Sequence, residues 1–306
     1  MTFLPLRIGT RGSPLALAQT HEFRRRLSGA HGVQEDAFPI QIIKTTGDMI
    51  QDRPLSEVGG KGLFTKEIDA AMLAGEIEVA IHSSKDLPTF TPAGIVIVGF
   101  LPREDPRDAF IGLKWRRLED LPHGARLGTS SLRRQALVKR LRPDLRVDMI
   151  RGNVGTRLSK IESGEFDATI LALAGLNRLG LAHKATSLLD LERFPPAVGQ
   201  GAIGLTMRAG DDATARMLAP ILDHDTGVAL AVERAFLTRL DGSCKTSIAG
   251  HAVVANGRVN FRGLVLSADG AKAFAVEREG PLADAARLGA DAAGDILARL
   301  PGGVLP

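Results

Sequence analysis

The stretch Leu6–Leu27, LRIGTRGSPLALAQTHEFRRRL, decides the fold class. It begins with a short apolar segment typical of a β-strand and continues as a helix-forming segment. Ser13 is a favourable N-cap and Pro14 is a favourable first helical residue, so we expect the helix to begin there. A strand that runs directly into a helix is the first part of a βαβ unit, which predicts a mostly parallel sheet.

The same alternation continues through the first two-thirds of the chain. Apolar runs predict further strands at residues 39–45, 78–84 and 94–100, with a helix at 65–76. Beyond Pro102–Pro106 the pattern begins again. It predicts helices beginning near Ser131 and Val154, and strands at 108–113, 126–130, 146–152 and 168–173. We therefore expect two α/β domains of similar size.

The last third of the chain has a different pattern. Residues 225–240 form an amphipathic helical segment that Asp225 or Thr226 could cap, and residues 251–279 contain three strand-like runs. The runs are separated by Asn256-Gly257 and Asp269-Gly270, dipeptides that favour hairpin turns. With a last helix over residues 281–300, this pattern predicts a small α+β domain.

Composition limits the classes of function. A net charge of +4 and a pI of about 9.4 favour an anionic ligand over a nucleic acid, and 4% aromatic residues with no Tyr supply few stacking platforms. The one Cys excludes a disulfide within the chain, and His82 and His251 lack the spacing of metal ligands, so we expect no metal. No apolar run approaches the roughly 18 residues of a membrane span, and the N-terminus lacks a secretory pattern. A cytoplasmic protein is expected.

Basic residues gather where the predicted strands lead into helices. Six of them lie on four such junctions: Arg11, Lys85, Arg133, Arg134, Arg151 and Arg157. Ligands of open parallel sheets bind at the carboxyl ends of the strands, where helix first turns add N–H donors. Any one of these side chains could simply be solvated, but together they predict a cleft for a ligand with several negative charges.

Asp86 lies in a turn within this cationic set. It could be a turn-forming residue only, or a carboxylate that stabilises positive charge on the reacting part of the ligand. The nearby segment GGKGLFTKE, residues 59–67, does not match the phosphate-loop pattern, which argues against a nucleotide enzyme. The polar, glycine-rich segment Met49–Gly60 is expected to be a mobile lid.

Cys244 is the single cysteine, and it follows Gly242, which could end the preceding helix. A helix C-terminus does not lower the pKa of a thiol, and no Cys–His arrangement is evident. Cys244 is therefore either an inert buried thiol or a thiol that is attached once to a reactive electrophile, which needs no strong activation.

Ten segments along the chain form a recognisable set. They are RIGTRGSPLALAQ, KTTGD, GGKGLFTKEID, AIHSSKDLPT, REDPRDAFI, GTSSLRRQAL, RGNVGTRL, LAGLNRLG, PAVGQGAIGL and ERAFLTRLDGSCKTSIAG. Taken together, these segments resemble the porphobilinogen deaminase family, the hydroxymethylbilane synthases, over essentially the whole chain. One local departure is GSCKTSIAG around the thiol, where many relatives have GGC and a nearby proline.

The resemblance implies a transferase of tetrapyrrole biosynthesis that joins four porphobilinogens head to tail, with release of ammonia, into hydroxymethylbilane. It implies that Cys244 holds a dipyrromethane cofactor through a thioether bond, and that Asp86 is catalytic and stabilises the azafulvene cation. It places Lys61 and Phe64 at the lid over the incoming ring. Cofactor and substrate binding fall on Arg11, Ser13, Lys85, Thr129, Ser131, Arg133, Arg134, Arg151 and Arg157.

The resemblance also implies the architecture: two α/β domains like those of periplasmic solute-binding proteins and a small α+β C-terminal domain that carries the cysteine. The expected boundaries are residues 1–101 with 198–220, residues 102–197, and residues 221–306. A monomer without metal, nucleic acid or membrane is expected. The competing class is a binding protein that captures an anion in the same two-lobed cleft without catalysis.

Overall fold

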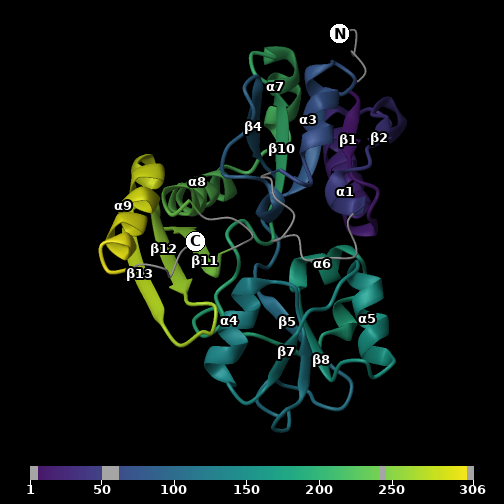
Figure 1. The fold of residues 1–306 in the computed structure, drawn as a ribbon. Helices are drawn as coiled ribbons and strands as arrows, with labels where there is room; N and C mark the ends of the chain where they lie inside the picture. Colours follow the sequence, from purple (N-terminus) through teal and green to yellow (C-terminus); the bar gives the residue numbers. More distant parts are fainter. Residues whose placement is uncertain (1–5, 50–61, 242–245, 302–306) are drawn as a thin grey trace. The chain divides into compact units, whose positions relative to one another are not determined.

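The computed structural model describes residues 6–49, 62–241 and 246–301. The chain forms two compact units, unit 1 with Met1–Arg103 and Ala202–Gly227, and unit 2 with Glu104–Gly201 and Val228–Pro306. Three sheets with their helices make up the fold (Figure 1). The predicted fold class, two α/β domains and a small α+β C-terminal domain, is confirmed. The predicted boundaries of three domains stay a prediction.

Unit 1 contains a five-stranded sheet in the order β2-β1-β3-β10-β4. Its strands are β1 (Ile8–Thr10), β2 (Ile40–Ile42), β3 (Val79–Ser83), β4 (Ile95–Phe100) and β10 (Ile203–Arg208). Strand β1 runs parallel to β2 and β3, whereas β10 is antiparallel to both β3 and β4. The sheet is therefore mixed, because a strand from much later in the chain is inserted between β3 and β4.

Helices cover both faces of this sheet. They are α1 (Pro14–His31), α2 (Thr46–Met49), α3 (Lys66–Leu73) and α7 (Asp212–Leu218), with the 3-10 turns η1 (Glu35–Ala37), η2 (Ser84–Asp86) and η4 (Ala219–Ile221). Alternate residues of β3 point to opposite faces. Val79 packs in a core cluster with Phe23 of α1, and Ala80 packs in another with Ile68 of α3.

The beginning of α1 confirms the prediction made from Leu6–Leu27. The Ser13 hydroxyl oxygen accepts a hydrogen bond from the Ala16 N–H at 3.3 Å, and Pro14 is the first helical residue. The helix ends at His31, and the next residue, Gly32, has a φ of 65°, a left-handed conformation that glycine adopts without steric cost.

Unit 2 contains a second five-stranded sheet with strands in the order β7-β6-β8-β5-β9. These are β5 (Asp108–Gly112), β6 (Arg126–Gly128), β7 (Arg146–Asp148), β8 (Ala168–Ala172) and β9 (Ser187–Leu188). Its helices are α4 (Leu132–Leu141), α5 (Val154–Glu162), α6 (Leu173–Arg178) and η3 (Ala182–Lys184). Strand β5 is antiparallel to β8, as β10 is to β3 in unit 1, so the two sheets share one pattern of strand directions, although β10 is the last strand of its sheet in the chain and β5 the first.

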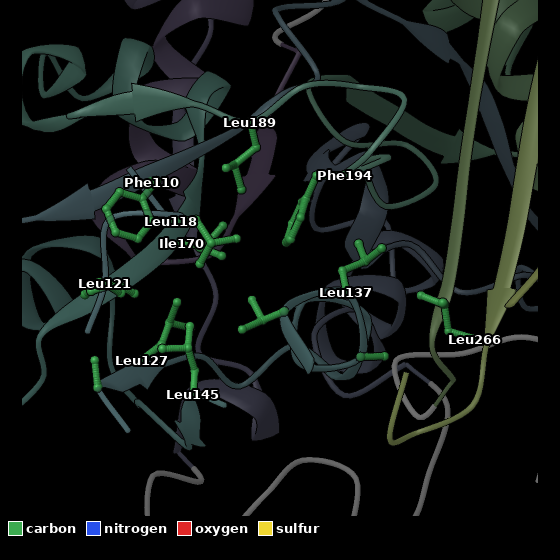
Figure 2. Packing of buried hydrophobic residues seen from close by; sticks show 14 residues of the cluster. Phe110, Leu118, Leu121, Leu127, Leu137, Leu145, Ile170, Leu189, Phe194 and Leu266 are labelled. Carbon is green, nitrogen blue, oxygen red and sulfur yellow. The ribbon is translucent and has the colours of Figure 1, made fainter. Parts of the chain in front are cut away.

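Helix α4 covers one face of this second sheet through a buried apolar cluster (Figure 2). Phe110 of β5 and Leu137 of α4 belong to it, and Leu266 of the C-terminal sheet joins the same cluster. The turn after that sheet strand also touches α4. A Cβ at Gly270, which has φ 73°, would lie 2.2 Å from the Ala136 carbonyl oxygen, so glycine is required there.

The C-terminal part consists of α8 (His224–Arg239), β11 (Ile248–Ala255), β12 (Arg258–Leu266), β13 (Ala273–Pro281), η5 (Leu282–Asp284) and α9 (Ala285–Leu297). The three strands form an antiparallel sheet, as predicted. Asn256 and Gly257 have φ angles of 52° and 70° at the tip of the first hairpin. Phe236 of α8 packs edge-on against Phe261 of β12, with ring centroids 4.9 Å apart.

Two details of this part correct the predictions. Asp223, and not Asp225 or Thr226, caps α8, because its carboxylate accepts the Thr226 N–H at 2.7 Å. The last helix is shorter than expected, since β13 extends to Pro281 and a 3-10 turn precedes α9. In the described part of the chain, none of the helices has the length and apolar character needed to cross a membrane.

Candidate active site

Four of the predicted site residues line one pocket of about 60 Å³ in unit 1, at the ends of β1 and β3. They are Arg11, Ser13, Phe64 and Asp86. Arg11 follows β1, and Asp86 closes the 3-10 turn that follows β3. Because β1 and β3 are parallel neighbours, their carboxyl ends bring these two charged groups together.

Arg11 is the most highly connected side chain of this pocket. Its Nε lies 3.2 Å from both carboxylate oxygens of Asp48, and its Nη2 lies 2.5 Å from Asp48 Oδ1. The guanidinium carbon lies 4.1 Å from the centroid of the Phe64 ring, in cation–π contact. Asp86 is more distant, with 3.8 Å between its Oδ2 and Arg11 Nη1. The Arg11 guanidinium therefore lies between the Asp86 carboxylate of the pocket and the Asp48 carboxylate beside it.

Asp48 is a residue of this site that the sequence analysis did not single out, although it lies in the quoted segment KTTGD. Burial opposes ionisation of Asp48, but hydrogen bonds from Arg11 and Thr45 outweigh it and hold the pKa of this carboxyl below its ordinary value. The Thr45 hydroxyl donates to Asp48 Oδ2 at 2.8 Å. Asp48 is therefore an ionised partner of Arg11.

His82 lines the same pocket and is buried, 6% exposed. Burial, together with the positive charge of Arg11, lowers its pKa to about 4. Its Nε2 lies 3.0 Å from the Thr206 hydroxyl of the inserted strand β10. His82 is thus a neutral side chain near pH 7 that joins β3 to β10.

Ser13 and Lys85 occupy the helical turns that border the pocket. The Ser13 hydroxyl caps α1, as described above, and it lines the pocket at the same time. Lys85 lies in η2 directly before Asp86 and is half-buried. The side chain of Gln19, also in the pocket lining, accepts a hydrogen bond from the Ser83 hydroxyl at 3.0 Å.

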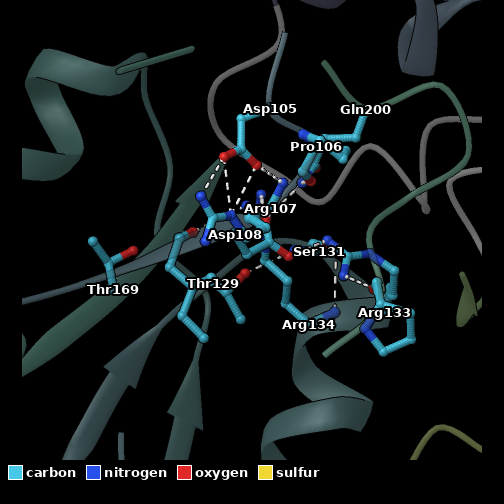
Figure 3. A network of polar contacts seen from close by, with 12 residues as sticks. Asp105, Pro106, Arg107, Asp108, Thr129, Ser131, Arg133, Arg134, Thr169 and Gln200 are labelled. Carbon is cyan, nitrogen blue, oxygen red and sulfur yellow. Dashed lines mark hydrogen bonds and ion pairs between the residues drawn. The ribbon is translucent and has the colours of Figure 1, made fainter. Parts of the chain in front are cut away.

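In unit 2 a second set of predicted residues surrounds one buried carboxylate (Figure 3). Asp108 of β5 binds Arg133 through Oδ2 and Arg134 through Oδ1, both at 2.7 Å. The Gln200 amide also donates to Asp108 Oδ1 at 2.9 Å. Asp108 is fully buried and both arginines are less than 10% exposed. Asp108 was not predicted from the sequence, although it lies within REDPRDAFI.

Backbone carbonyls complete the positions of the two guanidiniums. Arg133 donates to the Pro195 carbonyl at 2.6 Å, and Arg134 donates to the Ile170 carbonyl at 3.0 Å. Burial opposes ionisation of Asp108, but the two guanidiniums outweigh it and hold its pKa well below the ordinary range. One carboxylate neutralises only one of the two positive charges.

The other predicted residues of unit 2 lie near this network. Thr129 is buried, and its hydroxyl accepts the Ser131 N–H at 3.2 Å. The Ser131 hydroxyl caps α4 through the Arg134 N–H at 3.4 Å. Burial and the charges of Arg134 and Arg151 lower the pKa of Arg157 to about 10, so the cations of unit 2 lie close enough to repel one another.

Two predicted residues and the predicted lid lie outside the described residues. These are Cys244, Lys61 and, apart from Met49, the segment Met49–Gly60. Within the described ranges, no group of three or more His, Cys, Asp or Glu side chains could hold a metal ion. The roles of all the predicted site residues stay predictions.

An α/β scaffold that brings guanidinium groups and the Asp86 carboxylate to its strand ends is the arrangement predicted for a protein that binds an anionic ligand. Comparison with known proteins identifies the family to which the chain belongs. The family model "Porphobilinogen deaminase, dipyromethane cofactor binding domain" matches residues 6–216, and "Porphobilinogen deaminase, C-terminal domain" matches residues 228–298. This chain belongs to the porphobilinogen deaminase family, as the sequence predicted.

Individual relatives agree with the family models. The porphobilinogen deaminase of Nitrobacter winogradskyi is 59% identical over 292 residues, which cover 95% of this chain and 92% of the relative. That of Paracoccus denitrificans is 54% identical over 297 residues, covering 97% and 95%. Among solved structures, a YaeC-family lipoprotein of Enterococcus faecalis is 14% identical, with a TM-score of 0.42 over 71% of this chain and 90% of that one.

Proposed function

We propose that this chain is a hydroxymethylbilane synthase: it joins four porphobilinogen molecules head to tail, releases ammonia at each addition, and yields hydroxymethylbilane for tetrapyrrole biosynthesis. Family membership supports the activity. The observation that carries the chemistry is the pocket in which Asp86 lies 3.8 Å from Arg11. It provides a carboxylate for a developing cation and a guanidinium for an anionic substituent.

The cofactor of the family, a dipyrromethane, fits the residues of unit 2. Each of its pyrrole rings carries carboxylates, and the Asp108 network has one positive charge more than it has carboxylates. The buried Nε of Arg133 has no hydrogen-bond partner among the described residues. When bound, the dipyrromethane supplies the primer to which porphobilinogen is joined. We propose that Cys244 attaches it through a thioether.

The residues of unit 1 have distinct roles in this proposal. The Asp86 carboxylate stabilises the positive charge that develops on the pyrrole as ammonia leaves, and it accepts hydrogen bonds from pyrrole N–H groups. Arg11, Ser13 and Lys85 bind carboxylates of the substrate. Phe64 packs beside the incoming ring, with Lys61 nearby.

The residues of unit 2 hold the anionic product chain in this proposal. Arg133, Arg134, Arg151 and Arg157 bind carboxylates, and hydroxyls of Thr129 and Ser131 add neutral hydrogen bonds. Burial and repulsion by neighbouring guanidiniums lower the pKa of Arg157, and a bound carboxylate offsets the repulsion. Each addition brings two more carboxylates, so a site with several arginines is suited to a growing chain.

Purified protein incubated with porphobilinogen tests the proposal. Ammonia release and formation of a tetrapyrrole that oxidises to coloured porphyrin are expected together. Tight binding of porphobilinogen with neither product would instead identify a binding protein that captures its ligand without catalysis. The monomeric state, the cytoplasmic location and the independence from metal stay predictions, which gel filtration, cell fractionation and assay in a chelator would test.

A further inference from the structure

The hydrogen-bonding fork of Arg11 is occupied by Asp48 and not by Asp86. Three contacts of 2.5 to 3.2 Å join the Nε and Nη2 groups of Arg11 to Asp48. The single contact with Asp86, 3.8 Å from Nη1 to Oδ2, is longer than a hydrogen bond. The two carboxylates therefore compete for one guanidinium, and Asp48 holds it.

The surroundings fix this arrangement. The Thr45 hydroxyl donates a hydrogen bond to Asp48 Oδ2. The shortest contact of Arg11 is with the other carboxylate oxygen, Oδ1. The Gly47 N–H donates to the Leu63 carbonyl at 2.8 Å, which attaches the Asp48 turn to the segment that carries Phe64. The Phe64 ring in turn packs on the Arg11 guanidinium. Arg11 is thus held by hydrogen bonds at one edge and by a ring at one face.

The charges in the pocket follow from these contacts. Arg11 carries one positive charge, and Asp48 and Asp86 carry one negative charge each. Because the Asp48 charge offsets that of Arg11, the trio of Arg11, Asp48 and Asp86 keeps one net negative charge. This charge resides on Asp86, the carboxylate to which Arg11 donates no hydrogen bond. A carboxylate that must stabilise a cation is more effective when its own charge is not already neutralised.

We propose that Asp48 is a positioning residue: it holds Arg11 away from Asp86 and offsets its charge, so that Asp86 remains available for the cationic reaction centre. This inference rests on the proposed function. Asp48 does not itself touch the reacting atoms. Without its charge, Arg11 is free to close the 3.8 Å gap and form a full ion pair with Asp86.

Other titratable groups face this trio from the elements packed around it. His82 of β3 lines the same pocket, but it is largely neutral from pH 5 to 9 because its pKa is about 4. Lys85 of η2 adjoins Asp86 in sequence, and Glu67 of α3 accepts the Thr46 N–H at 3.2 Å beside Asp48. Loss of the Asp48 charge leaves more of the Arg11 charge to act on His82, which lowers its pKa further and keeps it neutral in the variant.

The test compares Asp48→Asn with the wild type and with Asp144→Asn, a matched control. Asp144 also forms a two-bond pair with an arginine, Arg142, but at a surface remote from the site in sequence and role. Rates of ammonia release from porphobilinogen are measured from pH 5 to 9 on the cofactor-loaded proteins. In Asp48→Asn, kcat falls by about tenfold at the wild-type optimum, because Arg11 neutralises part of the Asp86 charge.

The decisive readout is the acid limb of the kcat profile. A positive charge that is no longer offset disfavours protonation at the reaction centre, so the acid limb of the Asp48→Asn profile moves to lower pH. Asp48→Glu restores the carboxylate and returns the limb towards the wild-type position. Asp144→Asn leaves both kcat and the limb unchanged.

Three outcomes would overturn the inference. The first is a fall in kcat with no shift of the limb, which indicates a structural role only. The second is a lower KM with an unchanged limb, which identifies Asp48 as a competitor of substrate carboxylates. The third is a wild-type profile in a folded Asp48→Asn.

Thermal melting establishes whether the variant folds. If Asp48→Asn is unstable, Asp48→Ser is measured instead. A wild type that releases no ammonia rejects the proposed function and this inference with it, whereas the three outcomes above reject the inference alone.

Discussion

Asp108 binds Arg133 with one carboxylate oxygen and Arg134 with the other, so a single buried side chain fixes the positions of two neighbouring guanidiniums. The pair of arginines follows Ser131 at the start of α4, whereas Asp108 begins the antiparallel strand β5. The geometry of the predicted carboxylate site therefore depends on a contact between two elements that are separate in the chain.

Asp108→Asn is predicted to destabilise unit 2. The amide keeps the shape but leaves two buried guanidiniums without a counter-charge, and breaking a buried ion pair costs about 3–5 kcal/mol. Urea unfolding at pH 7 measures the loss. Asp144→Asn, which removes a carboxylate from the more exposed pair with Arg142, is the control and is expected to have a much smaller effect. Equal effects of the two changes would contradict the prediction.

The stability is also predicted to fall in acid because of Asp108. Its pKa is held low in the folded state, while an unfolded Asp has a pKa of about 3.9. The stabilisation is therefore fully present above about pH 4 and is lost as the pH falls from there towards the folded pKa. Urea unfolding at several pH values between 3 and 7 measures the slope. Asp108→Asn should flatten it, and an unchanged slope would assign the acid sensitivity to other carboxylates.

Arg134→Leu and Arg157→Leu are predicted to differ in their effects on folding. Both remove a cation from the carboxylate site, so both should impair assembly of the cofactor or elongation of the product chain by about tenfold or more. Arg134 is paired with buried Asp108, and its loss also lowers the melting temperature. Burial and the neighbouring cations both disfavour the charge of Arg157, so the loss of Arg157 should not lower the melting temperature. Melting curves and turnover rates of both variants test whether only the Arg134 change destabilises the fold. Arg157→Lys is expected to keep only part of the wild-type activity.

Asp86→Asn is predicted to lose far more activity than Asp86→Glu. The amide preserves the turn but removes the negative charge, and the loss of one preorganised electrostatic group costs about 10²–10³ in rate. Steady-state rates of ammonia release compare the three proteins. If Asn and Glu were equally active, the charge would have no role, and if both matched the wild type, Asp86 would be a turn residue only.

Cys244→Ser is predicted to fold but to lack the covalent primer. A hydroxyl is a much weaker nucleophile than a thiol near neutral pH, so the cofactor is not attached. Intact-mass spectrometry of the wild type should show an excess equal to two condensed porphobilinogen units, and thiol reagents should find no free cysteine. A fully active preparation in which Cys244 is unmodified and readily alkylated would exclude this role.

Local features of the fold were predictable from the sequence because short-range interactions determine them. The Ser13 cap of α1 and the Asn256-Gly257 hairpin both depend on residues within a few positions of one another. The family resemblance placed residues 198–220 in the first domain, but the antiparallel pairing of β10 was not predictable, since no local pattern encodes the contact of Ile203 with Ser83.

In the candidate site, too, residues with a local sequence signal were predicted and residues that depend on long-range contacts were not. Arg11 and Asp86 were found because each lies at a junction between a strand and a helical turn, where ligands bind in such sheets. Asp48 and Asp108 were missed because an isolated Asp in a short helix or at a strand end has no distinctive spacing. Their importance arises from the guanidiniums that the fold brings to them.

The insertion of β10 between β3 and β4 has a consequence for biosynthesis. Strands β3 and β4 are complete by Phe100, but the strand that pairs with both begins only at Ile203. At usual rates of translation, roughly a hundred residues take about 5–20 s to be added. Throughout that interval β3 and β4 each have an edge without its partner strand. We therefore expect the ribosome-bound chain to need chaperones that cover unpaired strands.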